Sequence, residues 1–178
     1  MLLAVAFAGK IGSGKTTVTT ALAKALGWPR ASFGDFVRKV ARERGVPETR
    51  RNLQELGTRL LESDAFDFCN SVLSSSGWRT GENLIMDGLR HVETVEIIRK
   101  LVQPAVLKIV SVSVSEATRA HRLRNRGESG VASIEAHSSE QQVTSVLQKH
   151  ADLEIDGDRP LEIIVAELLR WIGNQQNN

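Results

Sequence analysis

The 178-residue sequence has one cysteine, no long apolar run and almost no excess of charge of either sign. The single cysteine, Cys69, has no second cysteine to pair with and no cluster of metal-ligand residues nearby, which indicates a reducing, cytoplasmic setting. No stretch approaches the roughly 18 apolar residues of a membrane span. Residues 1–9 are apolar but lack the basic flank of a signal peptide. We therefore expect a cytoplasmic protein with no membrane partner.

The charge balance limits the class of partner. Lys and Arg number 23 and Asp and Glu 21, so the formal net charge of +2 does not by itself indicate nucleic acid. Of the 23 basic residues, 16 are Arg and 7 are Lys. Arg binds phosphate and carboxylate groups through paired hydrogen bonds, so this bias points to an anionic substrate. The hydrophobic content of 41% excludes a disordered chain, and the length predicts one domain over residues 1–178.

Strand-like and helix-like segments alternate along the chain. Apolar or extended segments predict strands at 2–8, 30–33, 83–87, 106–114 and 153–155. Helical spacing predicts helices at 16–26, 35–44, 92–102, 115–126 and from 161 onward, with two more between 48 and 76 and one near 140–150. The Asn/Gln-rich tail at 174–178 is expected to fray. The alternation predicts an α/β fold with a parallel sheet of about five strands.

The strongest motif lies between the first predicted strand and helix. It is Gly9-Lys10-Ile11-Gly12-Ser13-Gly14-Lys15-Thr16, which matches the phosphate-loop pattern G-x-x-x-x-G-K-[ST]. Its glycines let the backbone curl so that N–H groups point at phosphate oxygens, and the following helix adds partial positive charge. Lys15 is expected to bridge the β- and γ-phosphates of ATP, and the Thr16 hydroxyl to bind Mg²⁺. The predicted ATP-binding residues are Gly9, Gly12, Ser13, Gly14, Lys15, Thr16 and Thr17.

A phosphate loop alone does not distinguish a kinase from a switch or a motor. The guanine-specificity pattern N-K-x-D is absent from the sequence, and no D-x-x-G follows at the expected place, which argues against a GTPase switch. The chain is also too short for a motor ATPase with its additional modules. The remaining motifs therefore decide the class.

Three further segments follow the phosphate loop in order. They are Ser32-Phe33-Gly34-Asp35-Phe36-Val37-Arg38, Leu84-Ile85-Met86-Asp87-Gly88-Leu89-Arg90, and the arginine-rich stretch 119–127. With these segments the chain resembles the nucleoside monophosphate kinases of the adenylate kinase type, and less closely dephospho-CoA kinase, whose closing strand and helix are similar to residues 151–158 and the segment after them. The resemblance implies a three-layer P-loop NTPase fold with ATP and Mg²⁺ as cofactors, an acceptor-binding helical insert at about 35–80 and a short lid at about 127–139.

The resemblance also implies roles for individual residues. Arg38 and Arg90 would hold the acceptor, Asp87 would orient Mg²⁺-bound water, and Arg122 with Arg126 would clamp the transferred phosphoryl group. The sequence lacks the proline of the family's D-G-F-P-R segment, and its lid lacks the second basic pair and the zinc-binding cysteines of some adenylate kinases.

The residues themselves leave alternatives open. Arg122 and Arg126 are four residues apart on the predicted helix, so both can reach one phosphate, but they also fit a solvated helix face. For Arg119 and Arg124 the solvated helix face is the preferred interpretation. A surface position is likewise preferred for the basic residues of the insert, Arg50, Arg51 and Arg59. Asp87 ends an apolar strand, where ligands bind in open α/β sheets, but a buried acid there can also cap the next helix.

Asp35 has three interpretations. It fits an N-cap of its helix, a general base for a hydroxyl acceptor, or a residue that arranges Mg²⁺-bound water if the acceptor is a phosphate. Arg38, one turn further along the predicted helix, favours the phosphate acceptor.

The sequence therefore predicts a phosphotransferase that moves the γ-phosphoryl group of Mg-ATP to a small acceptor, best a nucleoside or deoxynucleoside monophosphate. The predicted residues are Lys15, Asp35, Asp87, Arg122 and Arg126 for catalysis, Asp35, Arg38 and Arg90 for the acceptor, and Thr16 and Asp87 for the metal. The alternatives are a kinase of a hydroxyl acceptor, such as dephospho-CoA or a nucleoside, and a slow or non-catalytic ATP-binding regulator. A nucleic-acid 5′ end is a less favoured acceptor, and the chain is expected to be a monomer or a homodimer.

Overall fold

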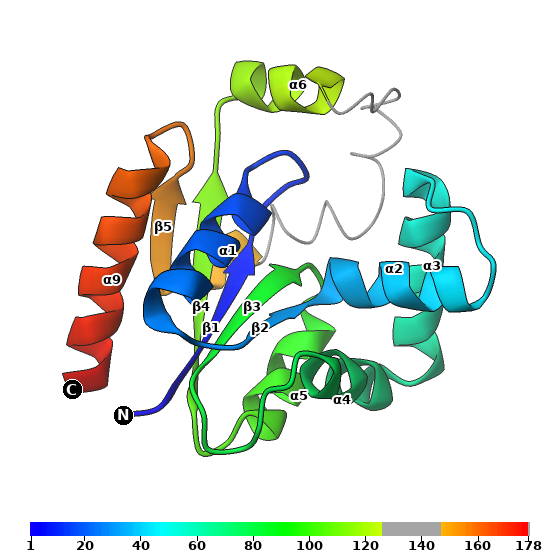
Figure 1. The fold of residues 1–178 in the computed structure, drawn as a ribbon, viewed down its shortest axis with the longest axis horizontal. Coiled ribbons are helices and arrows are strands. Elements are labelled where there is room, and N and C mark those ends of the chain that lie inside the picture. The colour runs from blue at the N-terminus through cyan, green and yellow to red at the C-terminus, as the bar shows by residue number, and fades with distance from the viewer. Residues whose placement is uncertain (126–146, 178) are drawn as a thin grey trace.

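The computed structural model describes residues 1–125 and 147–177 and contains a five-stranded, fully parallel sheet (Figure 1). The strand order is β2-β3-β1-β4-β5. The strands are β1 (Leu3–Ala8), β2 (Arg30–Ser32), β3 (Leu84–Leu89), β4 (Val106–Ser113) and β5 (Leu153–Asp156). The helices are α1 (Lys15–Leu26), α2 (Phe33–Glu43), α3 (Arg50–Ser63), α4 (Ala65–Ser75), α5 (Glu93–Leu101), α6 (Glu116–Asn125) and α9 (Leu161–Asn177), with a short 3₁₀ helix η2 at Gln148–His150. The predicted α/β class and parallel sheet are confirmed.

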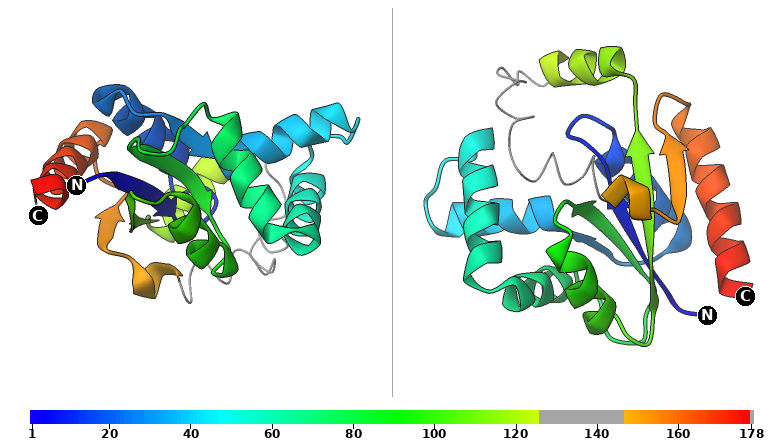
Figure 2. Two further views of the ribbon diagram at one scale, coloured as in Figure 1. Left: turned by 90° about the horizontal axis from the view of Figure 1, so that it is seen from below. Right: turned by 180° about the vertical axis from the view of Figure 1, so that it is seen from behind.

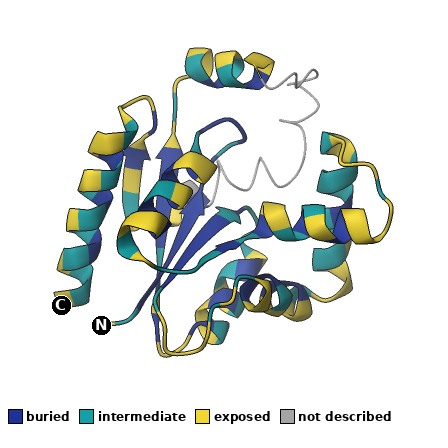
Figure 3. Ribbon diagram, in the orientation of Figure 1, coloured by how far each residue is buried: buried dark blue, intermediate teal, exposed yellow. Residues whose placement is uncertain are grey.

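The central strand β1 is buried on both faces, which explains its uninterrupted apolar sequence. Leu3, Val5 and Phe7 pack into one cluster with residues of α1 and α9. The alternate residues Ala4, Ala6 and Ala8 belong to a second cluster with α2, α4 and α5. The sheet is thus the middle of three layers, as the further views in Figure 2 show. The central strands β1 and β3 are mostly buried, whereas the outer helix faces are exposed (Figure 3).

Helices α2, α3 and α4 connect β2 to β3. Helices α2 and α3 extend beyond the β2 edge of the sheet, whereas α4 lies beside α5 (Figure 1). Each begins at a side-chain cap, from Ser32, Thr49 and Asp64 respectively. The interpretation of Asp35 as an N-cap is wrong, because the Asp35 backbone N–H instead donates to Ser32 Oγ at 3.2 Å. This frees the Asp35 side chain for the site described below. That the segment 35–80 binds the acceptor stays a prediction.

Several boundaries differ from the sequence-based expectation. Strand β3 runs two residues further, to Leu89, and α9 continues to Asn177, so the expected fraying is wrong for residues 174–177. The terminal amine of Met1 donates to the Gln176 carbonyl at 2.7 Å.

Some predictions lie outside the described residues. They concern Arg126, the predicted lid at 127–139 and most of the helix expected near 140–150. Within the described ranges, no helix is long and apolar enough to cross a membrane.

Candidate active site

The phosphate loop joins β1 to α1 at the carboxyl edge of the sheet, where ligands bind in open α/β folds. Its shape depends on glycine: Gly12 has φ +85°, and a Cβ there would lie 3.0 Å from Cγ of Arg119. Ser13 Oγ and the Lys10 carbonyl face the centre of the loop, because both contact Nζ of Lys15. The loop therefore curls around the Lys15 ammonium group.

Lys15 holds the loop closed from inside. The residue is only 6% exposed, and its ammonium group donates to the carbonyls of Gly9 and Lys10, the latter at 2.8 Å, and to Ser13 Oγ at 3.3 Å. Thr16 and Thr17 follow on the exposed first turn of α1. A cationic Nζ at the centre of a curled loop is the arrangement that a phosphate group requires.

A polar cleft extends from the loop toward α2 and α3. Its walls carry acidic groups, basic groups and the Thr16 hydroxyl; the charged residues are Lys15, Asp35, Arg38, Arg50, Asp87 and Arg90. The cleft thus brings the predicted metal and acceptor residues together with Gly12, Gly14 and Lys15 of the phosphate loop. Ser13, Thr17 and Arg122 line a different hollow, described below. The surface interpretation of Arg50 is wrong, whereas Arg51 and Arg59 are exposed as expected.

Asp87 is the most deeply buried acid of this cleft, with 4% of its side chain exposed. A buried carboxylate needs a charged partner, and Arg30 supplies it: Nη2 donates to Asp87 Oδ2 at 2.5 Å. Arg30 also donates from Nη1 to Asp35 Oδ2 at 3.0 Å, and Arg38 Nη1 donates to the other oxygen of Asp35 at 3.2 Å. Sequence analysis did not identify Arg30 as a residue of the site. The only feature of the sequence that points to it is its place in the predicted strand, two residues before Ser32.

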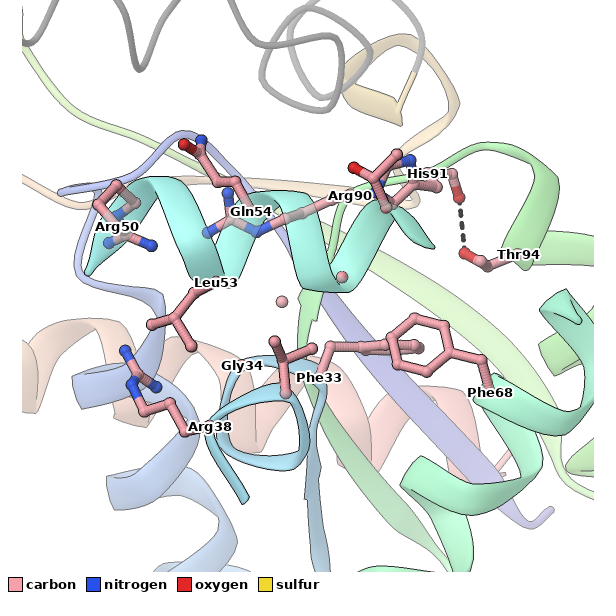
Figure 4. Close-up of a pocket in the computed structure, with 14 residues that line it drawn as sticks. Phe33, Gly34, Arg38, Arg50, Leu53, Gln54, Phe68, Arg90, His91 and Thr94 are labelled. Atoms are coloured by element: carbon pink, nitrogen blue, oxygen red, sulfur yellow. Dashed lines mark hydrogen bonds between the residues drawn. The ribbon is translucent and has the colours of Figure 1, made fainter. Parts of the chain in front are cut away.

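An apolar pocket adjoins the cleft between α2, α3 and α4 (Figure 4). Phe33 and Phe68 form one wall, with ring centroids 5.5 Å apart in an edge-to-face arrangement. Arg38, Arg50 and Arg90 stand at its polar rim. Gln54 and Thr58, one turn apart on α3, also line this pocket. Their Nε2 and Oγ1 atoms are buried and have no hydrogen-bond partner in the described part of the chain.

Arg122 approaches the phosphate loop from α6. Its Nη1 donates to the Ser13 carbonyl at 3.1 Å, and its Nη2 donates to the Gly157 carbonyl at 3.0 Å. A second hollow lies beside these contacts. Its lining is both polar and apolar and consists of Ser13, Gly14, Thr17, Val18, Arg122, Asn125, Gly157, Arg159, Leu161 and Ile164. Arg122 is therefore no solvated surface residue.

Arg119 is buried beneath the loop, with 2% exposure, so its expected surface position is wrong; Arg124 is exposed as expected. Arg119 Nη2 lies 3.0 Å from Glu116 Oε2. Partial burial alone would raise the pKa of Glu116, but the hydrogen bond and charge of Arg119, together with Lys10, outweigh it and lower that pKa. No local pattern predicts this burial, because it depends on the phosphate loop lying over α6.

The residues present fit a Mg²⁺ ion that is bound mainly through a nucleotide. The Thr16 hydroxyl and Asp87 line the same cleft, and within the described ranges only Oδ2 of Asp87 has a hydrogen-bond partner, so the other oxygen is available. No group of three or more His, Cys, Asp or Glu side chains gathers as a metal cluster anywhere in the described chain. Phosphate oxygens and water would have to supply the remaining ligands.

Comparison with known proteins identifies the family. The family model AAA_18, described as an AAA domain, matches residues 5–143, which include the phosphate loop and the β3 end with Asp87. The chain belongs to the AAA_18 family. The chain is also 33% identical over 129 residues to a UPF0200 protein of Hyperthermus butylicus. The match covers 72% of this chain and 67% of that protein. A cytidylate kinase of Methanocella arvoryzae is 29% identical over 170 residues, covering 94% and 88%.

Similar solved structures show that the chain has the P-loop kinase fold. A gluconokinase from Sinorhizobium meliloti superposes with a TM-score of 0.62 at 20% identity, covering 98% of this chain and 95% of that one. A shikimate kinase from Acinetobacter baumannii has the same TM-score at 15% identity, covering 100% and 97%. At these identities the likeness concerns the fold alone.

Proposed function

We propose that this protein transfers the γ-phosphoryl group of Mg-ATP to a nucleoside or deoxynucleoside monophosphate. One observation carries the proposal: the phosphate loop opens onto a cleft whose far end is an apolar, aromatic pocket rimmed by Arg38, Arg50 and Arg90. An apolar pocket beside a ring of guanidinium groups matches a ligand with a flat base and a phosphate. The similarity to a protein named cytidylate kinase supports the same class of acceptor.

The donor would occupy the phosphate loop. Lys15 and the backbone N–H groups of residues 9–14 would bind the β- and γ-phosphates, and Thr16 and Asp87 would hold the metal. When bound, Mg²⁺ neutralises charge on the phosphate oxygens. The hollow lined by Arg122 and Arg159 shares no lining residue with the acceptor pocket, and it would take the nucleoside part of ATP. Donor and acceptor would then approach the loop from two sides, as an in-line transfer requires.

The cations of the cleft would do most of the catalytic work. Phosphoryl transfer spreads negative charge over three equatorial oxygens, so fixed positive groups stabilise the transition state. Lys15 contributes from the donor side, and Arg38 and Arg90 from the acceptor side. Arg122 contacts loop carbonyls in this structure, so it would reach the phosphoryl group only after its side chain turns. Asp35 would not act as a base here, because both of its oxygens accept hydrogen bonds from guanidinium groups.

A hydroxyl acceptor is the second candidate, because the solved structures of this fold include a gluconokinase and a shikimate kinase. A hydroxyl has a proton to lose, so this mechanism needs Asp35 as a general base. The variants Asp35→Asn and Arg38→Ala separate the two cases. A phosphate acceptor predicts a larger loss of activity in Arg38→Ala, and a hydroxyl acceptor predicts a larger loss in Asp35→Asn.

The proposal is tested by following the products with ³¹P NMR. The wild-type protein is mixed with Mg-ATP and one nucleoside monophosphate at a time. Loss of the acceptor's monophosphate signal together with growth of diphosphate signals, without release of inorganic phosphate, supports the proposal. ATP that is bound but not consumed, with every acceptor, would instead favour the slow or non-catalytic regulator.

A further inference from the structure

The three guanidinium nitrogens of Arg30 donate hydrogen bonds to three different structural elements. Its Nε donates to Thr19 Oγ1 of α1 at 3.1 Å, its Nη1 to Asp35 of α2 at 3.0 Å and its Nη2 to Asp87 of β3 at 2.5 Å. Thr19 is fully buried and the Arg30 side chain is 18% exposed. A planar guanidinium held by three partners has one orientation, and the carboxylates that contact it are fixed with it.

Arg30 itself is not a wall of the polar cleft, whereas both of its carboxylate partners are. It lies behind Asp87 and Asp35 and holds each of them by Oδ2. The remaining oxygen of Asp35 contacts Arg38, so four groups of alternating charge run from Asp87 through Arg30 and Asp35 to Arg38. This chain of charges connects the proposed metal side of the cleft to the proposed acceptor side.

Stability alone does not explain such an arrangement. A buried ion pair contributes little more than well-packed apolar residues of the same volume, because both charges lose their hydration. The rest of the interior of this fold is apolar, with few buried charged groups among the described residues. Groups that orient the ligands of a metal or substrate have a functional reason to be charged and hydrogen-bonded.

We propose that Arg30 is a positioning residue, which orients Asp87 toward the metal side of the cleft and Asp35 toward Arg38. The proposal rests on the proposed function, because it assumes that Mg-ATP and an acceptor meet in this cleft. Without Arg30 the buried Asp87 carboxylate has no charge partner at Oδ2 and turns toward another cation. The carboxylate is then no longer held in the orientation that it has in the wall of the cleft.

The test uses Arg30→Gln, which keeps hydrogen-bond donors but no charge, and Arg30→Lys, which keeps the charge but not the three-way contact. The first readout is independent of turnover: the Kd of a non-hydrolysable ATP analogue with and without Mg²⁺. In the wild type Mg²⁺ should tighten binding. In both variants the Kd without Mg²⁺ should stay within about twofold, while the tightening by Mg²⁺ should fall about tenfold, the size of effect that loss of a ligand-orienting partner produces. Arg99→Gln, which breaks only the surface pair with Glu96, is the matched control.

The second readout separates kcat from KM for the acceptor. Arg30→Gln should lower kcat by about 10- to 100-fold, and Arg30→Lys should recover part of that loss. Folded Arg30→Gln or Arg30→Lys protein with an unchanged effect of Mg²⁺ on nucleotide binding would overturn the proposal. If Arg30→Gln does not fold, Arg30→Lys decides by the same criterion. A wild-type protein that shows no Mg²⁺-dependent binding would instead count against the proposed function, so the two failures are distinguishable.

Discussion

Arg122 on α6 donates to the carbonyl oxygen of Ser13 in the phosphate loop at 3.1 Å. The same guanidinium donates to the Gly157 carbonyl at 3.0 Å, which ties the loop to the connection between β5 and α9. Gly157 is packed so closely that a Cβ would lie 2.9 Å from the Ser13 carbonyl oxygen. Three segments far apart in the sequence thus meet at one arginine, next to the loop where we propose that ATP binds.

We predict that Arg122→Ala weakens catalysis much more than Arg124→Ala. Arg122 contacts the loop, whereas Arg124 is exposed on the same helix, so the pair is matched in residue type and position. Removal of one charge-stabilising donor typically lowers kcat by about 100-fold or more. Arg124→Ala should stay within about twofold of wild type, as surface substitutions usually do. Steady-state rates of ADP formation measure both, and equal rates in the two variants would contradict the role of Arg122.

Lys15→Ala should abolish turnover and leave the fold intact. The side chain donates to the loop carbonyls, and its charge would stabilise the β- and γ-phosphates, so a loss of at least about 100-fold in kcat is expected. The fold is checked by the circular dichroism spectrum. Lys10→Ala is the control, because the Lys10 ammonium faces Glu116 at 3.4 Å instead of the loop centre. A Lys15→Ala protein with near-wild-type activity would contradict the assignment of the phosphate loop.

Thr58→Val should stabilise the protein and weaken acceptor binding at the same time. The Thr58 hydroxyl is buried without a partner among the described residues, and such a group costs about 1 kcal/mol or more of unfolding free energy. Its removal should therefore raise the Tm. If the hydroxyl binds the acceptor base, the acceptor KM should rise about tenfold while the KM for ATP is unchanged.

Gln54→Leu should behave like Thr58→Val, because the Gln54 Nε2 is also buried without a described partner. Thr80→Val, on an exposed loop, should change neither Tm nor KM. A stabilised Thr58→Val protein with an unchanged acceptor KM would show that the hydroxyl does not contact the acceptor.

The ionisation of Asp158 predicts that the stability of the folded protein depends on pH. Hydrogen bonds from the Thr118 side chain and the Ser115 backbone N–H, the latter at 2.7 Å, lower the pKa of Asp158 below its ordinary value of 3.8. Because the folded pKa is the lower one, ionised Asp158 stabilises the folded state above pH 3.8, and the contribution is lost as pH falls through the folded pKa. Asp158→Asn should lower the Tm at neutral pH, and the difference should shrink in acid. Thermal unfolding between about pH 7 and pH 2 measures it, and a pH-independent difference would contradict the account.

Local patterns were enough to predict most of the fold. The apolar run of β1, the glycine spacing of the phosphate loop and the helical period of α9 each lie within one segment, so they can be recognised without knowing what packs against them. The places of Arg30, Arg50 and Arg119 could not be predicted in this way. Arg30 depends on contacts with Thr19, Asp35 and Asp87 from three other elements, and Arg119 on the loop that covers it. Such contacts arise only from tertiary packing.

The most direct test of the central claim is ADP release from Mg-ATP against a panel of acceptors. The panel holds ribo- and deoxynucleoside monophosphates, nucleosides, dephospho-CoA and a 5′-hydroxyl oligonucleotide. The account predicts strong stimulation by one or a few nucleoside monophosphates and none by the hydroxyl acceptors. Stimulation by a hydroxyl acceptor alone, or no stimulation by any acceptor while ATP is bound, would contradict it.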